Sequence, residues 1–431
     1  MKKQILSALI GLTIVSGSAF AAKEVHKPDQ NFISVIAEAG ITQENWDNGK
    51  NSKLIMKNAY RMTPHVEVST RSNDVHRLEN PVGFDLASYQ GNDFDGPLSL
   101  DILMRDRLNM ETVVITKDGK LIDEYYWNGT SKDSTHLQMS VTKSFTSLTA
   151  SIFAAKGMID MSKPITDYLP ELKASKGFSR ATVQEVADMR SGIKINFSEG
   201  LLWDDRMSNV QNWNGENKYP ELKGIIDFAS LVGERDDHGA GEYYDYQCTN
   251  TEMLAKVVER VTGDTMSDVF EENIWSKVGF EHDAKWMSNN DGEVIASGGL
   301  NITTRDVNRM MFVLINEGKN LKGEQIIPKK FIDNLLEGDD DVRSAWLLGK
   351  ETVITNDAWY KDQIRVFNIE GHKFIAFFGI HGQITVGEPN TGIVIAMNSA
   401  QDEMEGIRAF GITLKQVIPT ILKGVSAEAA K

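Results

Sequence analysis

Ser140 and Lys143 are the two residues of this 431-residue chain whose types and spacing most directly suggest chemistry. Residues three apart on a helix share one face, with Cβ atoms about 5–6 Å apart, so the lysine amine could reach the serine hydroxyl. A helix N-terminus favours negative charge. Burial and neighbouring groups can lower the pKa of a lysine from about 10.4, so that it accepts a proton. The pair could therefore supply an activated serine nucleophile.

The same Ser-x-x-Lys spacing recurs at Ser191 and Lys194, so the spacing alone does not identify a site. The second copy follows a helix that should start behind Thr182, whose capping box is completed by Glu185. Gly192 is then expected as the C-cap of that helix, and Lys194 would not lie one turn above Ser191. We interpret the second copy as structural.

Strand patterns occupy both ends of the region that carries these pairs. Two β-rich runs, 112–116 and 120–127, surround the turn Lys117-Asp118-Gly119 and predict a hairpin. After about residue 350 the pattern predicts further strands and a closing helix near 403–422. The predicted strands are Ile364–Ile369, Lys373–Phe378, Gln383–Val386 and Ile393–Met397.

The period between these strands is helical. Apolar residues recur at helical spacing from Val141 to Ile152, and Gly157 follows where a stop is expected, so Ser140 should lie in the first turn of a helix. Further helices are predicted at 183–190 and 251–261. We therefore predict an α/β (α+β) fold, in which the two terminal segments build one antiparallel sheet with flanking helices. A mostly helical region is inserted between them, and the site lies in the cleft.

The N-terminus has the pattern of a secretory signal peptide in residues 1–21. Lys2 and Lys3 precede a short apolar run, and Ala19-Phe20-Ala21 gives an A-x-A cleavage pattern. We expect a cut after Ala21 and a periplasmic or secreted protein without a stable membrane anchor. Residues 22–95 yield no element assignment and are treated as an N-terminal extension to a domain at 96–425.

Charge and motif content narrow the possible partners. The formal net charge is −15 with no prominent basic cluster, which disfavours nucleic acid as a partner. The chain has neither H-E-x-x-H nor a phosphate-binding P-loop nor G-x-S-x-G. We expect a small-molecule ester or amide substrate, with no metal and no organic cofactor. The oligomeric state is left open.

The segment from Met139 to Leu148, with sequence MSVTKSFTSL, resembles the active-site helix of the β-lactamase-related serine hydrolases. That family includes class C β-lactamases, D-Ala-D-Ala peptidases, esterases and 6-aminohexanoate-dimer hydrolases. By motif order and spacing, the resemblance covers about residues 100–420. It implies a β-lactamase/transpeptidase-like fold, with Ser140 as nucleophile and Lys143 as a proton-handling partner.

A second family motif is matched at Tyr246. The segment from Tyr244 to Leu254, and the Val-Glu-Arg-Val-Thr-Gly run ending at Gly263, look most like the 6-aminohexanoate-dimer hydrolase branch. The resemblance implies that Tyr246 shuttles a proton between the nucleophile, the lysine and the leaving group. Where class C β-lactamases have asparagine, this chain has Cys248, a poor hydrogen-bond donor that could contact substrate or simply pack.

The third motif falls at Phe377-Phe378-Gly379, where lactamases have Lys-Thr-Gly. The absent lysine makes an ester or amide a better candidate substrate than a β-lactam. The same register implies that the backbone N–H groups of Ser140 and Ile380 form the oxyanion hole. His381 and Trp203 are candidate substrate-binding residues, with ordinary structural roles as the alternative.

Together these patterns predict an exported serine hydrolase that cleaves an ester or amide through an acyl-enzyme. Three alternatives remain: a cell-wall D-Ala-D-Ala peptidase of the same fold, a β-lactamase, and a non-catalytic binding protein that retains the fold.

Overall fold

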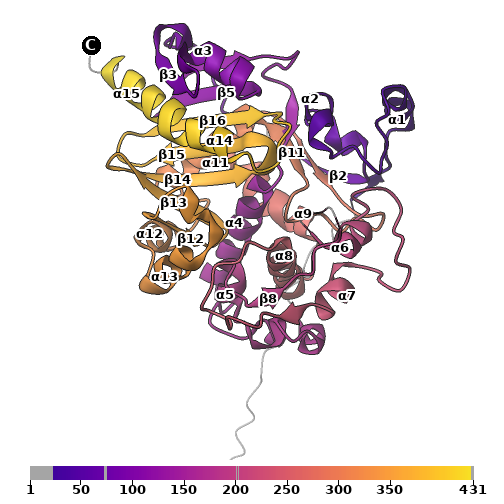
Figure 1. Ribbon diagram of the computed structural model, residues 1–431. Coiled ribbons are helices and arrows are strands. Elements are labelled where there is room, and N and C mark those ends of the chain that lie inside the picture. The colour runs from indigo at the N-terminus through magenta and orange to yellow at the C-terminus, as the bar shows by residue number, and fades with distance from the viewer. Residues whose placement is uncertain (1–22, 72–74, 200, 202, 429–431) are drawn as a thin grey trace, which may run out of the picture.

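The computed structural model describes residues 23–71, 75–199, 201 and 203–428 (Figure 1). The signal peptide predicted at 1–21 lies outside the described residues. Within the described ranges, no helix is both long and apolar enough to cross a membrane.

A seven-stranded antiparallel sheet joins segments from the two ends of the predicted domain. Its order is β12-β13-β14-β15-β16-β5-β6. β16 pairs with β5 across the join, with Ile395 opposite Ile115. The predicted hairpin and the four predicted C-terminal strands are confirmed. The strands are β5 (Met110–Lys117), β6 (Lys120–Tyr126), β12 (Ala358–Lys361), β13 (Ile364–Ile369), β14 (His372–Gly379), β15 (Gln383–Glu388) and β16 (Ile393–Ser399).

Both faces of this sheet are covered. Successive side chains of a strand point to opposite faces, so each strand contributes to two apolar clusters. In β16, Ile393, Ile395 and Met397 pack in the cluster that contains the C-terminal helices. Val394 and Ala396 pack in the cluster on the other face, against α11 (Thr304–Ile315). The predicted closing helix forms α14 (Ile407–Ile412), a π-helical turn at Thr413–Val417, and α15 (Ile418–Glu428). Figure 1 shows α14 and α15 lying across the sheet.

The inserted helical region is built around α4 (Val141–Ala155), which packs against α8 (Cys248–Thr262) and β14. The helix predicted at 183–190 is α5 (Val183–Ala187), with its capping box formed. It ends earlier than predicted, because Met189 takes a left-handed φ of 56°. The other helices of the region and its border are α3 (Leu100–Ile102), α6 (Asp205–Val210), α7 (Ile225–Ser230), α9 (Met266–Phe270), α10 (Ser276–Val278), α12 (Lys329–Glu337) and α13 (Asp340–Leu348).

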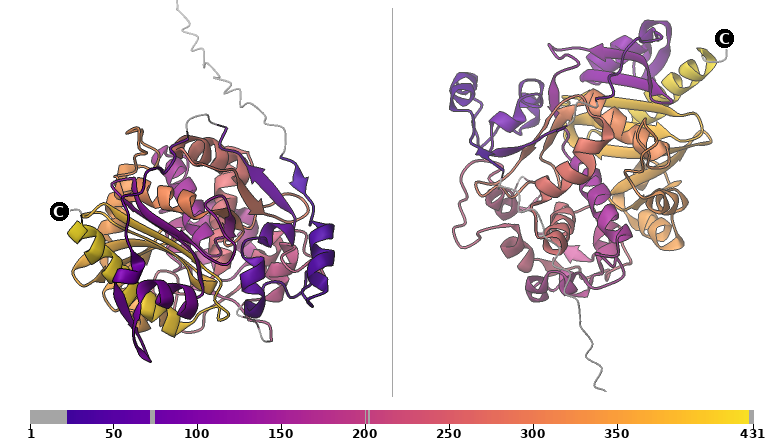
Figure 2. Two further views of the ribbon diagram at one scale, coloured as in Figure 1. Left: turned by 90° about the horizontal axis from the view of Figure 1, so that it is seen from above. Right: turned by 180° about the vertical axis from the view of Figure 1, so that it is seen from behind.

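A second sheet, which the sequence patterns did not predict, incorporates the N-terminal extension. Its order is β1-β2-β10-β11-β7, and every pair is antiparallel. Its strands are β1 (Val25–His26), β2 (His65–Val68), β7 (Thr135–Leu137), β10 (Ala284–Met287) and β11 (Leu300–Thr303). Together with α1 (Gln30–Ala37) and α2 (Ser52–Ile55), the extension packs onto the fold (Figure 2). Two further two-stranded ladders join β3 (Gln90–Asp93) to β4 (Gly96–Ser99), and β8 (Ile193–Lys194) to β9 (Gly233–Glu234).

Candidate active site

Ser140 lies at the N-terminal end of α4, as the sequence predicts, three residues after the end of β7. Met139 before it has a left-handed φ of 47°, and such a conformation in a bulky residue is uncommon. Strained backbone of this kind gathers at functional sites. The chain therefore turns sharply at Met139, and Ser140 remains partly exposed while the rest of the first helical turn is buried.

Lys143 reaches the serine hydroxyl. Its Nζ donates to Ser140 Oγ at 2.9 Å and to the carbonyl oxygen of Ser297 at 2.7 Å. The lysine side chain is almost completely buried, with 1% of its residue surface exposed. The lysine side of the Ser-Lys pair is therefore shielded from solvent, and its hydrogen bonds are electrostatically stronger than they would be in water.

The pKa of Lys143 is raised, whereas the sequence led us to expect that it would be lowered. Burial is the largest influence and lowers this pKa, but electrostatic interaction and hydrogen bonding with the side chains of Cys248 and Tyr246 raise it by more. Lys143 therefore keeps its proton at neutral pH. An ammonium group at this position donates to Ser140 and leaves the role of proton acceptor to a neighbour.

Tyr246 and Cys248 both lie beside Lys143. Cys248 is the first residue of α8, and Tyr246 precedes that helix by two residues. Lys143 Nζ is 5.0 Å from the centroid of the Tyr246 ring. Because α4 packs against α8, two motifs about a hundred residues apart in the sequence meet at one point.

The segment predicted to complete an oxyanion hole also lies next to Ser140. Gly379 ends β14 so close to the preceding segment that a Cβ there would lie 2.5 Å from the Gln138 carbonyl oxygen. A side chain at Gly379 would force these segments apart. Ile380 follows directly, and it packs in the same apolar cluster as Met139.

His381 and Trp203 are not brought into contact with the Ser-Lys pair. His381 is fully buried, with Nδ1 2.7 Å from the carbonyl oxygen of Gln401. Trp203 accepts a hydrogen bond from the backbone N–H of Ser198, and its indole N–H is buried without a partner among the described residues. Substrate binding by these two residues stays a prediction.

Glu252 and Arg365 also belong to the site, although neither was predicted from the sequence. Glu252 on α8 is buried and accepts backbone N–H bonds from Ala296 and Ser297, so it holds the carbonyl that anchors Lys143. Glu252 follows Cys248 by four residues on α8, so helical spacing from the second motif could have pointed to it. Arg365 on β13 has its guanidinium carbon 4.9 Å from the Tyr246 ring centroid. No sequence pattern pointed to it.

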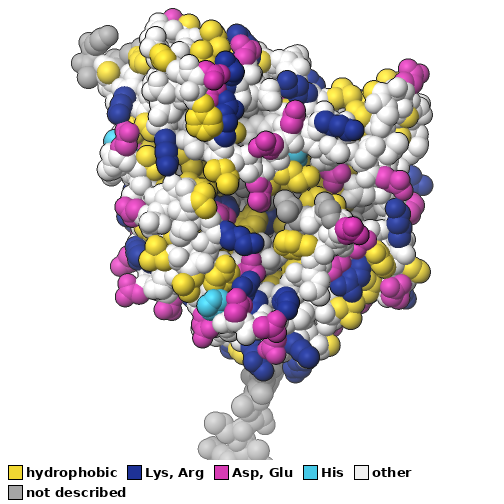
Figure 3. Space-filling view, in the orientation of Figure 1, with side chains coloured by type: hydrophobic (Ala, Val, Ile, Leu, Met, Phe, Trp, Pro, Cys, Tyr) yellow, Lys and Arg dark blue, Asp and Glu magenta, His cyan; other side chains and the backbone are white. Residues whose placement is uncertain are grey.

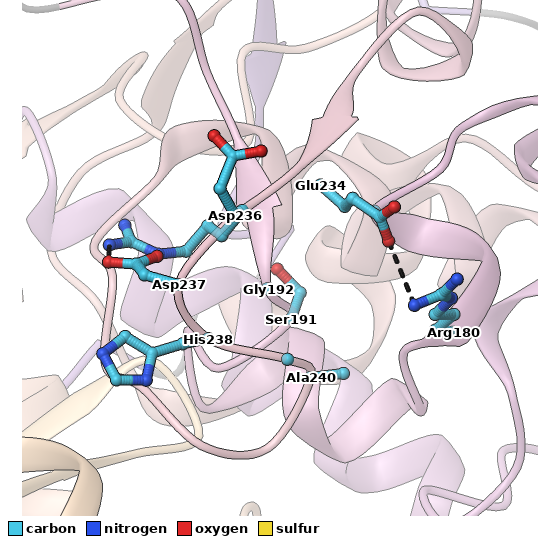
Figure 4. Close-up of a pocket in the computed structure, with 11 residues that line it drawn as sticks. Arg180, Ser191, Gly192, Glu234, Asp236, Asp237, His238 and Ala240 are labelled. Atoms are coloured by element: carbon cyan, nitrogen blue, oxygen red, sulfur yellow. Dashed lines mark hydrogen bonds and ion pairs between the residues drawn. The ribbon is translucent and has the colours of Figure 1, made fainter.

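The second Ser-x-x-Lys copy does not form a Ser-Lys pair, as the sequence predicts. Ser191 Oγ donates to Asn250 at 2.6 Å, whereas Lys194 lies on β8 and pairs with Asp236 at 2.6 Å. Gly192 has a φ of 72°, but it is not the C-cap of α5, which ends at Ala187. Ser191 lines a cavity of about 400 Å³ that also has Arg180, Glu234, Arg235, Asp236 and Asp237 in its lining (Figure 4). Neither Ser140 nor Lys143 lines that cavity.

Comparison with known proteins agrees with this geometry. A sequence model of the beta-lactamase family matches residues 109–416. The chain belongs to the beta-lactamase family. With its Ser-Lys pair formed, this family member is a serine hydrolase of the β-lactamase fold.

The similar proteins include two named as 6-aminohexanoate-dimer hydrolases, the branch that the Tyr246 segment resembles. The 6-aminohexanoate-dimer hydrolase of Paenarthrobacter ureafaciens is 28% identical over 300 residues, covering 67% of this chain and 72% of that protein. A solved structure from Bacillus anthracis, provisionally assigned as a 6-aminohexanoate-dimer hydrolase, superposes with a TM-score of 0.77. It shares 22% identity and covers 94% of this chain and 98% of its own. A family VIII carboxylesterase superposes with a TM-score of 0.52 at 13% identity, over 72% of this chain and 94% of its own.

The face of the molecule shown in Figure 3 is hollowed near its centre, with hydrophobic side chains gathered around the hollow. In the same orientation, Figure 1 draws the sheet on one side of this place, and α6 and α8 on the other, with α4 between them. A concave, largely apolar surface with a few polar groups suits a small organic substrate.

Proposed function

We propose that this protein is an exported serine hydrolase that cleaves an ester or amide bond through an acyl-enzyme on Ser140. The observation that carries the proposal is the 2.9 Å contact between Lys143 Nζ and Ser140 Oγ at the first turn of a buried helix. A lone serine is a weak nucleophile and needs such an arrangement to attack a carbonyl.

The geometry supports a division of labour around the nucleophile. Lys143 carries its proton and orients Ser140 Oγ by donating to it. Tyr246, beside that ammonium, takes the proton of Ser140 as the bond to the substrate carbonyl carbon forms, and returns it to the leaving group. The backbone N–H groups of Ser140 and Ile380 hold the oxyanion. In the second step, a water molecule attacks the acyl carbon and gives a proton to Tyr246. That proton passes to Ser140 Oγ as the bond between Oγ and the acyl carbon breaks.

An ester or a linear amide is favoured over a β-lactam. The position of the lactamase lysine is taken by Phe377, which is fully buried and packs against Phe145 on α4 at a centroid distance of 6.0 Å. That position therefore supplies no cation for a substrate carboxylate. The relatives include proteins named as a 6-aminohexanoate-dimer hydrolase and as a carboxylesterase, which fits either bond type.

Export follows from the predicted signal peptide. Lys23, two residues beyond the expected cut, forms ion pairs with Asp268 and Glu271, and β1 begins at Val25. The mature chain would thus be tied into the fold close to its new N-terminus. A periplasmic or secreted location and a small ester or amide substrate complete the proposal.

Hydrolysis of a short-chain p-nitrophenyl ester tests the proposal. Purified mature protein should turn the ester over, and Ser140→Ala and Lys143→Ala should abolish turnover while remaining folded. Ser191→Ala is the matched control, because it removes the serine of the structural copy. Turnover that survives Ser140→Ala would refute the proposal. Turnover of a chromogenic cephalosporin, or of a peptidoglycan peptide in place of the ester, would favour the lactamase or the peptidase alternative.

A further inference from the structure

Two cations lie against the ring of Tyr246. Lys143 Nζ is 5.0 Å from the ring centroid, and the guanidinium carbon of Arg365 is 4.9 Å from it. The lysine comes from α4, and the arginine comes from β13 of the seven-stranded sheet. Lys143 already has a role, because it contacts Ser140. Arg365 has none in the steps described above.

Arg365 is held rigidly in this place. Its residue surface is 7% exposed, and Glu351 receives both of its parallel hydrogen bonds, at 2.6 Å from Nε and 2.5 Å from Nη2. The hydroxyl of Tyr244 donates to the same carboxylate at 2.7 Å. The rings of Tyr360 and Phe378 lie 5.1 and 5.4 Å from the guanidinium carbon.

Packing alone does not account for this arrangement. Replacing a buried ion pair by apolar residues is often neutral or stabilising, so an ion pair beside a reactive group calls for another explanation. A guanidinium keeps its positive charge at every physiological pH, whereas a lysine can lose it.

We propose that Arg365 is a positioning residue that favours the negatively charged form of Tyr246, and so sets the pH range in which Tyr246 can take the proton of Ser140. This inference rests on the function proposed above. The proton moves from Ser140 Oγ to the Tyr246 oxygen as the bond between Oγ and the carbonyl carbon forms. It passes to the leaving group as the scissile bond breaks.

The charges around Tyr246 give the inference a directional test. The titratable and charged groups against its ring are Lys143 on α4, Tyr360 on β12 and Arg365 on β13. Cys248 on α8 lies beside Lys143. Glu351 lies behind Arg365 and carries the opposite charge. Loss of the Arg365 charge should therefore disfavour the phenolate, whereas loss of the Glu351 charge should favour it.

The experiment is the pH profile of kcat/KM for p-nitrophenyl ester hydrolysis. Arg365→Gln should move the rising limb to higher pH by about one pH unit, which lowers kcat/KM roughly tenfold on that limb and restores it at alkaline pH. Glu351→Gln should move the limb to lower pH. The double variant, which has lost both charges, should return close to the wild type, and Arg365→Lys should stay close to it.

A second measurement is independent of turnover. The tyrosinate absorption of each variant, taken as the difference from the same variant carrying Tyr246→Phe, should move along the pH axis in the same directions. The inference would be overturned if kcat/KM fell equally at every pH while the rising limb stayed in place. It would also be overturned if Arg365→Gln and Glu351→Gln moved the limb in the same direction. If Ser140 is labelled by a fluorophosphonate while the profiles stay unmoved, only this inference fails. An unlabelled Ser140 refutes the proposed function and this inference with it.

Discussion

Lys143 illustrates why the chemistry of a residue depends on its neighbours as much as on its burial. A buried lysine with no partners would lose its proton readily, and the sequence alone led to that expectation. The structure places Cys248 and Tyr246 beside it, and they raise its pKa instead. The lysine thus acts as a fixed cation in the first step, and its contact with Ser297 keeps it aimed at Ser140.

Replacing the thiol by a hydroxyl tests this electrostatic role of Cys248. Cys248→Ser removes the largest of the influences that raise the pKa of Lys143, so that pKa should fall. If protonated Lys143 is needed for activity, the alkaline, falling limb of kcat/KM should shift to lower pH, while the rising limb stays in place. The pH profile of ester hydrolysis measures both limbs. A uniform loss of activity, with neither limb displaced, would show that Cys248 serves packing alone.

The turn between β12 and β13 carries a buried carboxyl group. Asp362 in this turn is buried, accepts a hydrogen bond from Gln184 at 2.9 Å, and donates its backbone N–H to Asp188 at 2.9 Å. Burial and the charge of Asp188 raise the pKa of Asp362 to about 7. The next residue, Gln363, accepts a hydrogen bond from Ser144 through its carbonyl oxygen, so the turn braces the catalytic helix.

The raised pKa makes a prediction about stability. Because the folded-state pKa of Asp362 lies above its ordinary value of 3.8, its stabilising contribution is complete below that value and is lost as pH rises to about 7. An asparagine at this position cannot ionise, so Asp362→Asn avoids this loss of stability. Its amide oxygen can still accept the hydrogen bond from Gln184. The variant should be more stable than the wild type at pH 8 by about 1 kcal/mol or more, with the difference vanishing near pH 4. Urea unfolding at both pH values measures this. A variant less stable at pH 8 would contradict the assignment.

The N-terminal extension supports the site through one apolar cluster. Trp46 is fully buried, its ring centroid is 4.8 Å from that of Trp213, and its Nε1 donates to the Trp213 carbonyl at 2.8 Å. The same cluster contains Met139 and Ile380, which flank the nucleophile and the predicted oxyanion hole. The extension therefore fixes backbone on which the proposed chemistry depends.

Truncating Trp46 should consequently affect both stability and activity. Trp46→Ala should cost about 3–5 kcal/mol, as for other buried aromatic residues, and should also lower kcat/KM at temperatures where the variant is folded. Trp275→Ala is the matched control, because Trp275 is equally buried in a cluster that contains neither Met139 nor Ile380. Equal kcat/KM values for the two folded variants would argue against a supporting role of the extension.

At the scale of the whole molecule, the sequence patterns predicted elements formed by one continuous segment. They did not predict the sheet and the contacts that join distant segments. The hairpin, the strands of the C-terminal half and the helix behind Ser140 were predictable, since each has its own period and turn residues. The second sheet was not, because β1, β2, β7, β10 and β11 are two to four residues long and pair across the chain. Arg365 was not predicted as a site residue for the same reason, because only the pairing of distant segments brings it to Tyr246.

The boundary of the mature protein is a further whole-molecule prediction. Protein recovered from the periplasm or medium of an expressing bacterium should begin at Ala22, because Ala19-Phe20-Ala21 fits the cleavage pattern. Intact mass and N-terminal sequencing give the start directly. Ala21→Leu, which places a large residue before the cut, should accumulate as the uncleaved form. An exported chain that still carries residues 1–21 would refute the predicted cleavage.

Covalent labelling with a fluorophosphonate tests the central claim most directly, because it needs no knowledge of the natural substrate. Mass spectrometry of the mature protein should show a single adduct, on the peptide that contains Ser140. The adduct should be absent in Ser140→Ala, strongly reduced in Lys143→Ala and unchanged in Ser191→Ala. An adduct on another residue, or a folded wild-type protein that takes up no label, would contradict Ser140 as the nucleophile.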